Sequence, residues 1–191
     1  MELILSDWFA QREKPKGRLL WYKPEELARL LKVTVGAWKT IAMLCARAGL
    51  RRGEAYHLGW DDVDFERNRL HIAPKPGWNP KDYERRWIPM AADLRDYLKG
   101  LQRKGEWVLG DDRPTLDVIS SYWRKLAKKA GIKGTVHTLR HAFGSHLASA
   151  GVSIYQIKDL MGHASVETTA IYSHLSPEAL SSAVDKLPRI K

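Results

Sequence analysis

The spacing of hydrophobic residues fits helices along most of the chain and changes once, in the middle. Residues 69–73 alternate between polar and apolar side chains, which indicates a strand, and residues 84–89 follow as its partner. The segment between them, residues 74–83, contains three prolines and a glycine and predicts a turn-rich tip. A single hairpin among helices predicts a mainly α domain with a small antiparallel β-sheet.

Helix start and stop signals divide the remaining sequence. Pro24, followed by two glutamates, starts the first helix, and Gly49 follows an apolar helical face as a stop signal. Ser153 and Ser165 are suited to cap the helices that follow them. The other predicted helices cover residues 37–48, 93–104, 115–130 and 138–150, a short stretch up to Gly162, a segment that carries Tyr172, and residues 179–186.

The charge of the chain favours a nucleic-acid partner. There are 32 lysines and arginines against 22 aspartates and glutamates, a formal net charge of +10, and a basic domain is attracted to polyanions. The single cysteine, Cys45, excludes an internal disulfide framework and fits a reducing compartment. No apolar stretch is long enough to span a membrane, and the first residues do not resemble a signal peptide. We therefore expect a cytoplasmic protein that associates with DNA.

Length and local composition predict two parts. The 191 residues suit one domain, and residues 11–18 show charge, proline and glycine without periodicity. We expect residues 1–20 to form an arm or linker and residues 21–191 to form one domain.

Four short motifs carry groups suited to phosphodiester chemistry. Two arginines can hold phosphate oxygens through paired donors, and a tyrosine hydroxyl can attack phosphorus. A tyrosine with its ordinary pKa near ~10 is only about 0.1% ionised at neutral pH, so it needs a base or a strongly positive pocket. The departing oxygen needs an acid, which a lysine can supply. The motifs are G-L-R-R-G-E at residues 49–54, Lys81 eight residues before Pro89, H-T-L-R-H at 137–141, and M-G-H at 161–163 with Tyr172 nine residues later.

These motifs, in this order, resemble the catalytic domain of the tyrosine recombinases, the phage-integrase and Xer-like family. The resemblance covers residues 20–185 and implies the fold of that domain for residues 21–191. Glu54 matches the acidic residue that follows the first arginine of the family pattern. The residues that match the catalytic pattern are Arg51, Lys81, His137, Arg140, His163 and Tyr172.

The resemblance implies a role for each of these residues. Tyr172 attacks the scissile phosphate and forms a 3′-phosphotyrosine with release of a 5′ hydroxyl. Arg51, Arg140 and His163 stabilise the charge on the phosphoryl oxygens. No metal, nucleotide or other cofactor is implied, because the covalent bond to tyrosine conserves the energy of the phosphodiester.

Proton transfer is assigned by the same resemblance to Lys81, which protonates the leaving oxygen, and to His137, which assists at the tyrosine. Lys75 is the alternative lysine, because a flexible hairpin tip can bring either ammonium group to a phosphate. The eight-residue spacing to Pro89 favours Lys81.

Other interpretations are open for this sequence. A type IB topoisomerase shares the fold and nearly the same residues, and a DNA-binding module without catalysis shares the charge. A zinc site on His137 and His141, four residues apart, is disfavoured because a threonine follows His137 where zinc proteases carry glutamate. Arg51 and Arg52 beside Glu54 can also form an ordinary surface ion-pair cluster.

Double-stranded DNA is the expected partner. Family members carry an N-terminal helical DNA-binding domain, whereas only some twenty residues precede the first predicted helix here. We therefore expect the chain to lack that domain and to bind DNA with fewer phosphate contacts. The last predicted helix, residues 179–186, is expected either to dock on a neighbouring copy in a homotetramer on DNA or to pack on its own domain.

Overall fold

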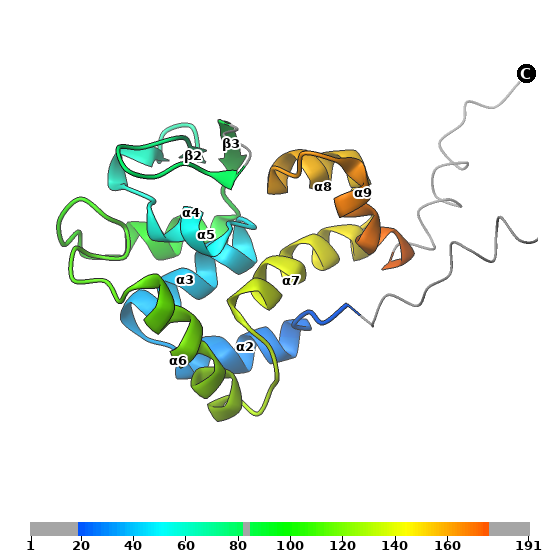
Figure 1. The fold of residues 1–191 in the computed structure, drawn as a ribbon, viewed down its shortest axis with the longest axis horizontal. Helices are drawn as coiled ribbons and strands as arrows, with labels where there is room; N and C mark the ends of the chain where they lie inside the picture. The colour runs from blue at the N-terminus through cyan, green and yellow to red at the C-terminus, as the bar shows by residue number, and fades with distance from the viewer. Residues whose placement is uncertain (1–18, 82–84, 176–191) are drawn as a thin grey trace, which may run out of the picture.

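The computed structural model describes residues 19–81 and 85–175 of the chain (Figure 1). Its α-helices are α2 (Pro24–Val33), α3 (Gly36–Arg47), α4 (Arg52–Tyr56), α5 (Ala92–Lys99), α6 (Leu116–Lys129), α7 (Val136–Ser149), α8 (Ile154–Met161) and α9 (Val166–Thr169). Two 3₁₀ segments, η1 (Trp60–Asp62) and η3 (Ala170–Leu175), and three strands, β1 (Val63–Asp64), β2 (Arg69–Ile72) and β3 (Arg86–Pro89), complete the described elements.

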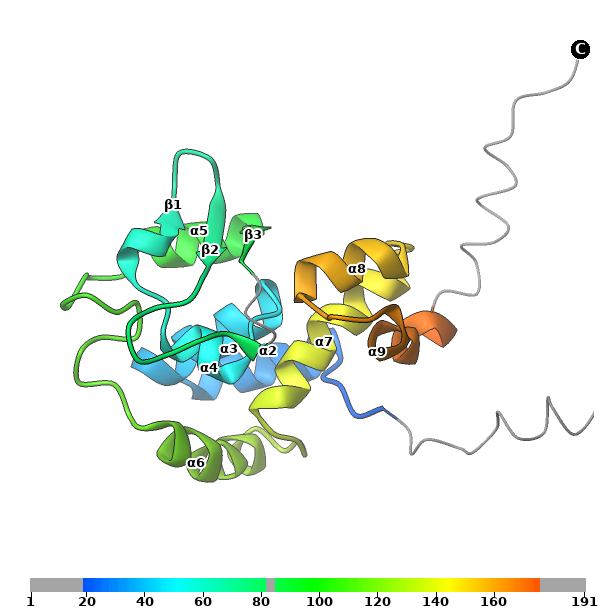
Figure 2. The same ribbon diagram turned by 45° about the horizontal axis from the view of Figure 1, so that its top comes forward.

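Helices α3 and α7 pack against each other in the middle of the domain (Figures 1 and 2). Leu44 and Cys45 of α3 and Leu139 of α7 are fully buried. Apolar residues at helical spacing must be covered, which explains why these two segments pair. Helix α6 contacts α2, α4 and α7 and buries Trp123 completely. The main core therefore lies between α3, α6 and α7.

A second, smaller cluster lies at the other end of α7, where α8 and η3 pack on it and α9 packs on α8 and η3 (Figure 2). Its buried members are Ala148, Ile157, Met161 and Tyr172. Ser153 caps α8 by accepting a hydrogen bond from the Gln156 backbone N–H, as the sequence predicts. This arrangement brings the C-terminal end of α8 towards the N-terminal half of the chain.

The sheet is antiparallel with strand order β1-β2-β3. Strands β2 and β3 pair with Arg69 opposite Pro89 and Ile72 opposite Arg86, which confirms the predicted hairpin. Strand β1 was not expected, because two residues are too few to show an alternating pattern. The small sheet in a mostly helical domain confirms the predicted fold class.

Several element boundaries differ from the sequence prediction. Helix α5 ends at Lys99, before Gly100, and not at residue 104. The five residues of α4 were not predicted as a helix, because they are too short to show periodicity. Tyr172 lies on the 3₁₀ segment η3 and not on an α-helix. The predicted last helix, residues 179–186, lies outside the described residues, as does almost all of the predicted arm.

Cys45 is buried in the main core, where burial raises the pKa of its thiol to about 12. Cys45 is therefore a core residue. Within residues 19–81 and 85–175, no helix combines the length and the apolar character that crossing a bilayer requires.

Candidate active site

The turn between α3 and α4 places Arg51 and Glu54. Gly49 has a φ of +66°, and a Cβ there would lie 2.5 Å from the Phe143 ring, so this position favours glycine for both the turn and the contact with α7. The Arg51 backbone N–H donates to the Glu54 carboxylate at 2.8 Å and fixes the start of α4. Glu54 is only 2% exposed, whereas Arg52 turns to the surface near Ser120. The alternative of an ordinary surface ion-pair cluster is therefore wrong.

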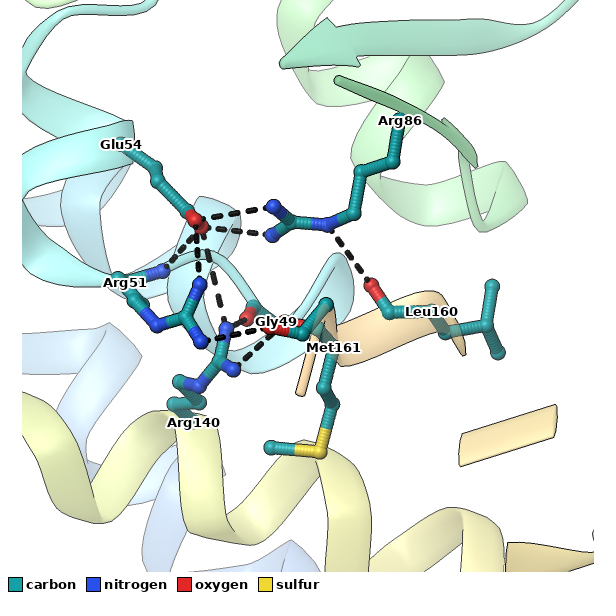
Figure 3. Close-up of polar contacts among 8 residues, drawn as sticks. Gly49, Arg51, Glu54, Arg86, Arg140, Leu160 and Met161 are labelled. Carbon is teal, nitrogen blue, oxygen red and sulfur yellow. Dashed lines mark hydrogen bonds and ion pairs between the residues drawn. The ribbon is translucent and has the colours of Figure 1, made fainter. Parts of the chain in front are cut away.

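Three arginines from different elements converge on the Glu54 carboxylate (Figure 3). Arg86, the first residue of β3, donates two hydrogen bonds, from Nη1 to Oε1 at 3.0 Å and from Nη2 to Oε2 at 2.7 Å. Arg51 donates from Nη1 to Oε1 at 3.0 Å. Arg140 of α7 holds Nη1 at 3.8 Å from Oε2, an ion pair beyond hydrogen-bond distance. Three guanidinium groups therefore surround a single carboxylate, and the net charge of this cluster is positive.

Backbone carbonyls orient two of these arginines. Arg140 donates through Nη1 to the carbonyl of Gly49 and through Nη2 to that of Met161 at 2.6 Å. Arg51 donates through Nη2 to the carbonyl of Gly162 at 2.6 Å. These acceptors are neutral, so they fix the guanidinium groups without cancelling their charge. Burial lowers the pKa of Arg140 to about 10, which leaves it cationic at neutral pH.

Arg86 is a residue that the family pattern does not mark. Burial alone would raise the pKa of Glu54, but the hydrogen bonds and charge of Arg86, followed by the charge of Arg140, hold that pKa below its usual range. The sequence does contain a signal for Arg86, because residues two apart on a strand share a face and Ile88 is fully buried. The neighbouring Arg85 is exposed.

His163 follows Gly162, whose left-handed conformation ends α8. Its Nδ1 lies 2.9 Å from the Thr169 hydroxyl of α9, and the residue is 8% exposed. Burial, with the charges of Arg140 and Arg51, lowers the pKa of His163 to about 3. The ring is therefore neutral at neutral pH, and when the Thr169 hydroxyl donates to Nδ1 its single N–H lies on Nε2.

Tyr172 is fully buried between η3 and α7. Its hydroxyl lies 2.9 Å from Nδ1 of His141. A Cβ on Gly144 would lie 2.7 Å from the Tyr172 ring, so the glycine leaves the space that the ring fills. Burial raises the pKa of Tyr172 to about 12, against the charge of Arg140. The hydroxyl thus points to α7 and keeps its proton at neutral pH.

Two histidines extend from Tyr172 along the first turns of α7. The rings of His137 and His141 meet edge to face with centroids 4.5 Å apart. Burial, with the charges of His137 and Arg140, lowers the pKa of His141 to about 4. His137 lies on the surface, and partial desolvation followed by the charges of Arg140, Arg51 and Lys81 lowers its pKa. His141, which carried only the disfavoured metal hypothesis, is therefore the direct partner of the tyrosine.

Lys81 and Lys75 lie at opposite ends of the hairpin tip and differ in their surroundings. Lys81 is exposed, and its charge reaches His137. Lys75 places its ammonium group 2.5 Å from the Asp62 carboxylate and 5.3 Å from the centroid of the Trp107 ring. The ion pair ties Lys75 to the body of the domain, which favours Lys81 as the lysine of the site.

The hairpin tip itself is anchored by an aromatic contact. Trp78 stacks on His57, with ring centroids 4.5 Å apart and an interplanar angle of 16°. A backbone pair between Lys75 and Trp78 closes the turn. These contacts attach the tip to the residues that follow α4.

A basic pocket of about 340 Å³ opens beside His137. Two arginines, Arg52 and Arg124, line it together with Ser120, Thr135 and Val136. The pocket is therefore a cationic surface next to the clustered histidines.

Among the described residues, no group of three or more His, Cys, Asp or Glu side chains is arranged to hold a metal ion.

Contacts bring five of the six sequence-predicted residues into two groups, and Lys81 is related to them through its charge. Arg51 and Arg140 lie together at Glu54, with His163 beside the carbonyls that hold them. His137 and Tyr172 are linked through His141. Lys81 approaches from the hairpin, where its charge acts on His137. The arrangement can bind an anion next to a tyrosine hydroxyl and neutral imidazole rings.

Residues 21–179 of the chain match the Phage integrase family. The tyrosine recombinase XerA of Thermococcus kodakarensis is 35% identical over 180 residues, which cover 87% of this chain and 62% of that protein. The integrase of Salmonella phage P22 is 26% identical over 196 residues, which cover 93% of this chain and 49% of that protein. The chain thus spans about three fifths or less of the length of these relatives.

Solved structures show the same fold. The crystal structure of XerA recombinase matches with a TM-score of 0.69 and 26% identity over 94% of this chain and 67% of that chain. The catalytic domain of bacteriophage HP1 integrase matches with a TM-score of 0.70 and 26% identity over 89% of this chain and 96% of that domain. With the family match over most of its length, the chain belongs to the phage integrase family.

Proposed function

We propose that residues 21–191 form the catalytic domain of a site-specific DNA recombinase, which cuts and rejoins DNA strands through a 3′-phosphotyrosyl intermediate. The observation that carries this proposal is a tyrosine hydroxyl placed, through His141 and Arg140, beside a cluster whose cationic groups outnumber its one carboxylate. The 35% identity to a tyrosine recombinase supports the same reaction type.

The phosphate group of duplex DNA is the anion that this cluster would bind. Arg51 and Arg140 are oriented by neutral carbonyls before any ligand arrives. Preorganised donors stabilise the charge that builds up on phosphoryl oxygens in the transition state, because they need no rearrangement at that moment. Neutral His163 would add one N–H donor at the same place.

Tyr172 would then form the bond to phosphorus while the bond from phosphorus to the 5′ oxygen breaks. In the arrangement described here, transfer of its proton to His141 is strongly unfavourable, because burial raises the pKa of Tyr172 to about 12 and lowers that of His141 to about 4. A bound phosphodiester brings negative charge, which raises the proton affinity of the nearby histidines. We infer that DNA binding makes His137 and His141 better proton acceptors and that η3 moves to expose the hydroxyl.

Lys81 would give a proton to the departing 5′ oxygen, so that the leaving group departs as a hydroxyl. Its exposure and its electrostatic contact with His137 support this assignment. Lys75 is the weaker candidate, because leaving Asp62 would abandon an ion pair at 2.5 Å.

The proposal is tested with nicked suicide duplexes, from which the cut strand diffuses away and leaves the covalent adduct. The substrate is a pool with randomised sequence around the nick, and the readout is a protein–DNA adduct that survives SDS. We expect the adduct with wild type and none with Tyr172→Phe. Tyr155→Phe is the matched control, because Tyr155 is 66% exposed on α8 and should leave the adduct unchanged. An adduct undiminished in Tyr172→Phe would refute the nucleophile.

The same preparation separates two other activities. A topoisomerase relaxes supercoiled plasmid of any sequence, and a catalytically silent module binds duplex without forming an adduct. We expect an adduct on selected sequences and no relaxation of a plasmid that lacks them.

The reaction also requires several copies of the protein to act together, because strand exchange joins two duplexes. We propose a homotetramer on DNA held by the last predicted helix, residues 179–186, so native mass measurement should show loss of the tetramer when the chain ends at Leu175.

A further inference from the structure

Glu54 binds its three arginines unequally. Arg86 makes the two-pronged contact, one nitrogen to each carboxylate oxygen, at 3.0 and 2.7 Å (Figure 3). Arg51 shares Oε1 through one side-chain nitrogen, and Arg140 stays at 3.8 Å. Paired contacts of this kind are the strongest that a carboxylate makes with a guanidinium group. Most of the negative charge of Glu54 is therefore matched by Arg86.

Arg86 is itself poorly placed to touch DNA. Its side chain is 9% exposed, and its third nitrogen, Nε, donates to the carbonyl of Leu160 at 3.4 Å. The α8 cap covers it as well, because a Cβ on Gly162 would lie 2.8 Å from the guanidinium. The Arg140 side chain is even less exposed, at 2%, so Arg86 differs from it in its partners: both of its Nη atoms bind the Glu54 carboxylate. Arg86 thus faces the interior with all of its nitrogens engaged.

We propose that Arg86 is a positioning residue for the phosphate site: it neutralises Glu54, so that Arg51 and Arg140 keep their positive charge for the scissile phosphate. This inference rests on the proposed function. Arg51 and Arg140 hold their orientation through the neutral carbonyls of Gly162, Gly49 and Met161. Without Arg86, the buried carboxylate would draw these two arginines to itself, because an unpaired buried charge is strongly unfavourable.

The position of Arg86 also connects the general acid to the phosphate site. Arg86 begins the strand that follows the hairpin tip, five residues after Lys81. Its contacts with Glu54 of α4 and with Leu160 of α8 hold this end of the hairpin against both helices. The Arg86 side chain therefore fixes the positions of the Glu54 carboxylate, the two arginines and the base of the hairpin relative to one another.

The test measures the rate of adduct formation on a suicide duplex with either a normal phosphate or a methylphosphonate at the scissile position. Methylphosphonate lacks the negative charge that Arg51 and Arg140 would neutralise. We expect Arg86→Gln to slow the reaction on phosphate about 100-fold, and to slow it much less on methylphosphonate. Arg85→Gln, at the exposed neighbouring position, should react like wild type on both substrates.

A double variant gives the second readout. Glu54→Gln combined with Arg86→Gln removes both the carboxylate and its main partner, so the rate on phosphate should recover to within about 10-fold of wild type. Arg86→Lys keeps the charge without the two-pronged geometry and should fall between wild type and Arg86→Gln. If Arg86→Gln fails to fold, the comparison of Arg86→Lys with the double variant decides the question.

Besides an Arg86→Gln variant that reacts like wild type, two results would overturn the inference. One is a defect of equal size on phosphate and methylphosphonate, which indicates a role in folding alone. The other is a double variant as slow as, or slower than, the slower of Arg86→Gln and Arg86→Lys. Absence of an adduct with wild type would refute the proposed function, whereas a normal adduct with an unaffected Arg86→Gln would refute only the role of Arg86.

Discussion

Burial and the positive charge of the site keep the His141 and His163 rings neutral. Burial and the charge of Arg140 lower their pKa values to about 4 and about 3. In the unfolded chain each histidine would bind a proton near pH 6.5, so between these limits the unfolded chain holds more protons than the folded domain. The free energy of unfolding therefore falls as the pH is lowered through this range.

A pH prediction follows for His163. Lowering the pH from 6.5 to 5 should cost roughly 1 kcal/mol of stability through His163, because partial solvent screening reduces the effect of the full shift. Replacing His163 with glutamine removes one titrating group, so His163→Gln should show a shallower loss in urea unfolding across that range. The buried Glu54 acts in a lower window, because its pKa lies below the ordinary carboxyl range. A pH dependence identical to that of wild type would contradict the neutral state of His163.

The six residues of the family pattern could be predicted at the scale of single residues, because their spacing along the chain is characteristic. The roles of two further residues of the site could not be predicted in this way. His141 contacts Tyr172 across 31 positions of sequence, and Arg86 contacts Glu54 across 32. Such contacts depend on how helices and strands pack, and the roles of these residues follow from partners that no local spacing reveals.

At the scale of elements, the hairpin differs most from the sequence expectation. Its tip is held by Trp78 on His57 and by Lys75 on Asp62. Stacking between aromatic rings depends on which distant side chains meet, so prolines and glycines alone could predict the turn but not its anchoring. Long helices such as α6 and α7 were predictable from their apolar periodicity, whereas α4, β1 and η3 were too short for this signal.

The anchored tip predicts how Lys81 acts. Trp78→Ala should loosen the tip and slow adduct formation roughly 10- to 100-fold, because the acid is no longer held in place. A substrate with a 5′-thio leaving group needs no proton and should restore most of the rate. Trp87→Ala is the control, since Trp87 lies 46% exposed on β3 of the same hairpin. An equal defect on the thio substrate would show that Lys81 is not what the tip positions.

At the scale of the whole molecule, the net charge of +10 would govern the binding to DNA that we propose. The logarithm of the affinity should fall linearly with the logarithm of the salt concentration. Arg124 of α6 lines the basic pocket beside His137, so Arg124→Gln should reduce that slope by about 1 and weaken binding to all sequences. The rate of adduct formation at saturating DNA should stay near that of wild type.

The matched control is Arg67→Gln, because Arg67 lies 68% exposed on the turn between β1 and β2. That turn is at the opposite side of the domain from α6 in both views (Figures 1 and 2). Arg67→Gln should leave the slope of log affinity against log salt concentration unchanged. Equal slopes for all three proteins would show that DNA does not lie on the α6 side.

The carbonyls that hold the arginines also determine when the site can form during synthesis. Arg51 is bound by Gly162, which is made 111 residues later, and Arg140 is bound by Gly49 and Met161. The cationic cluster therefore assembles only after α8 has left the ribosome and docked. Contacts between distant positions also form late in folding. A nascent or partly folded chain would carry all of its arginines and still lack the arranged anion site.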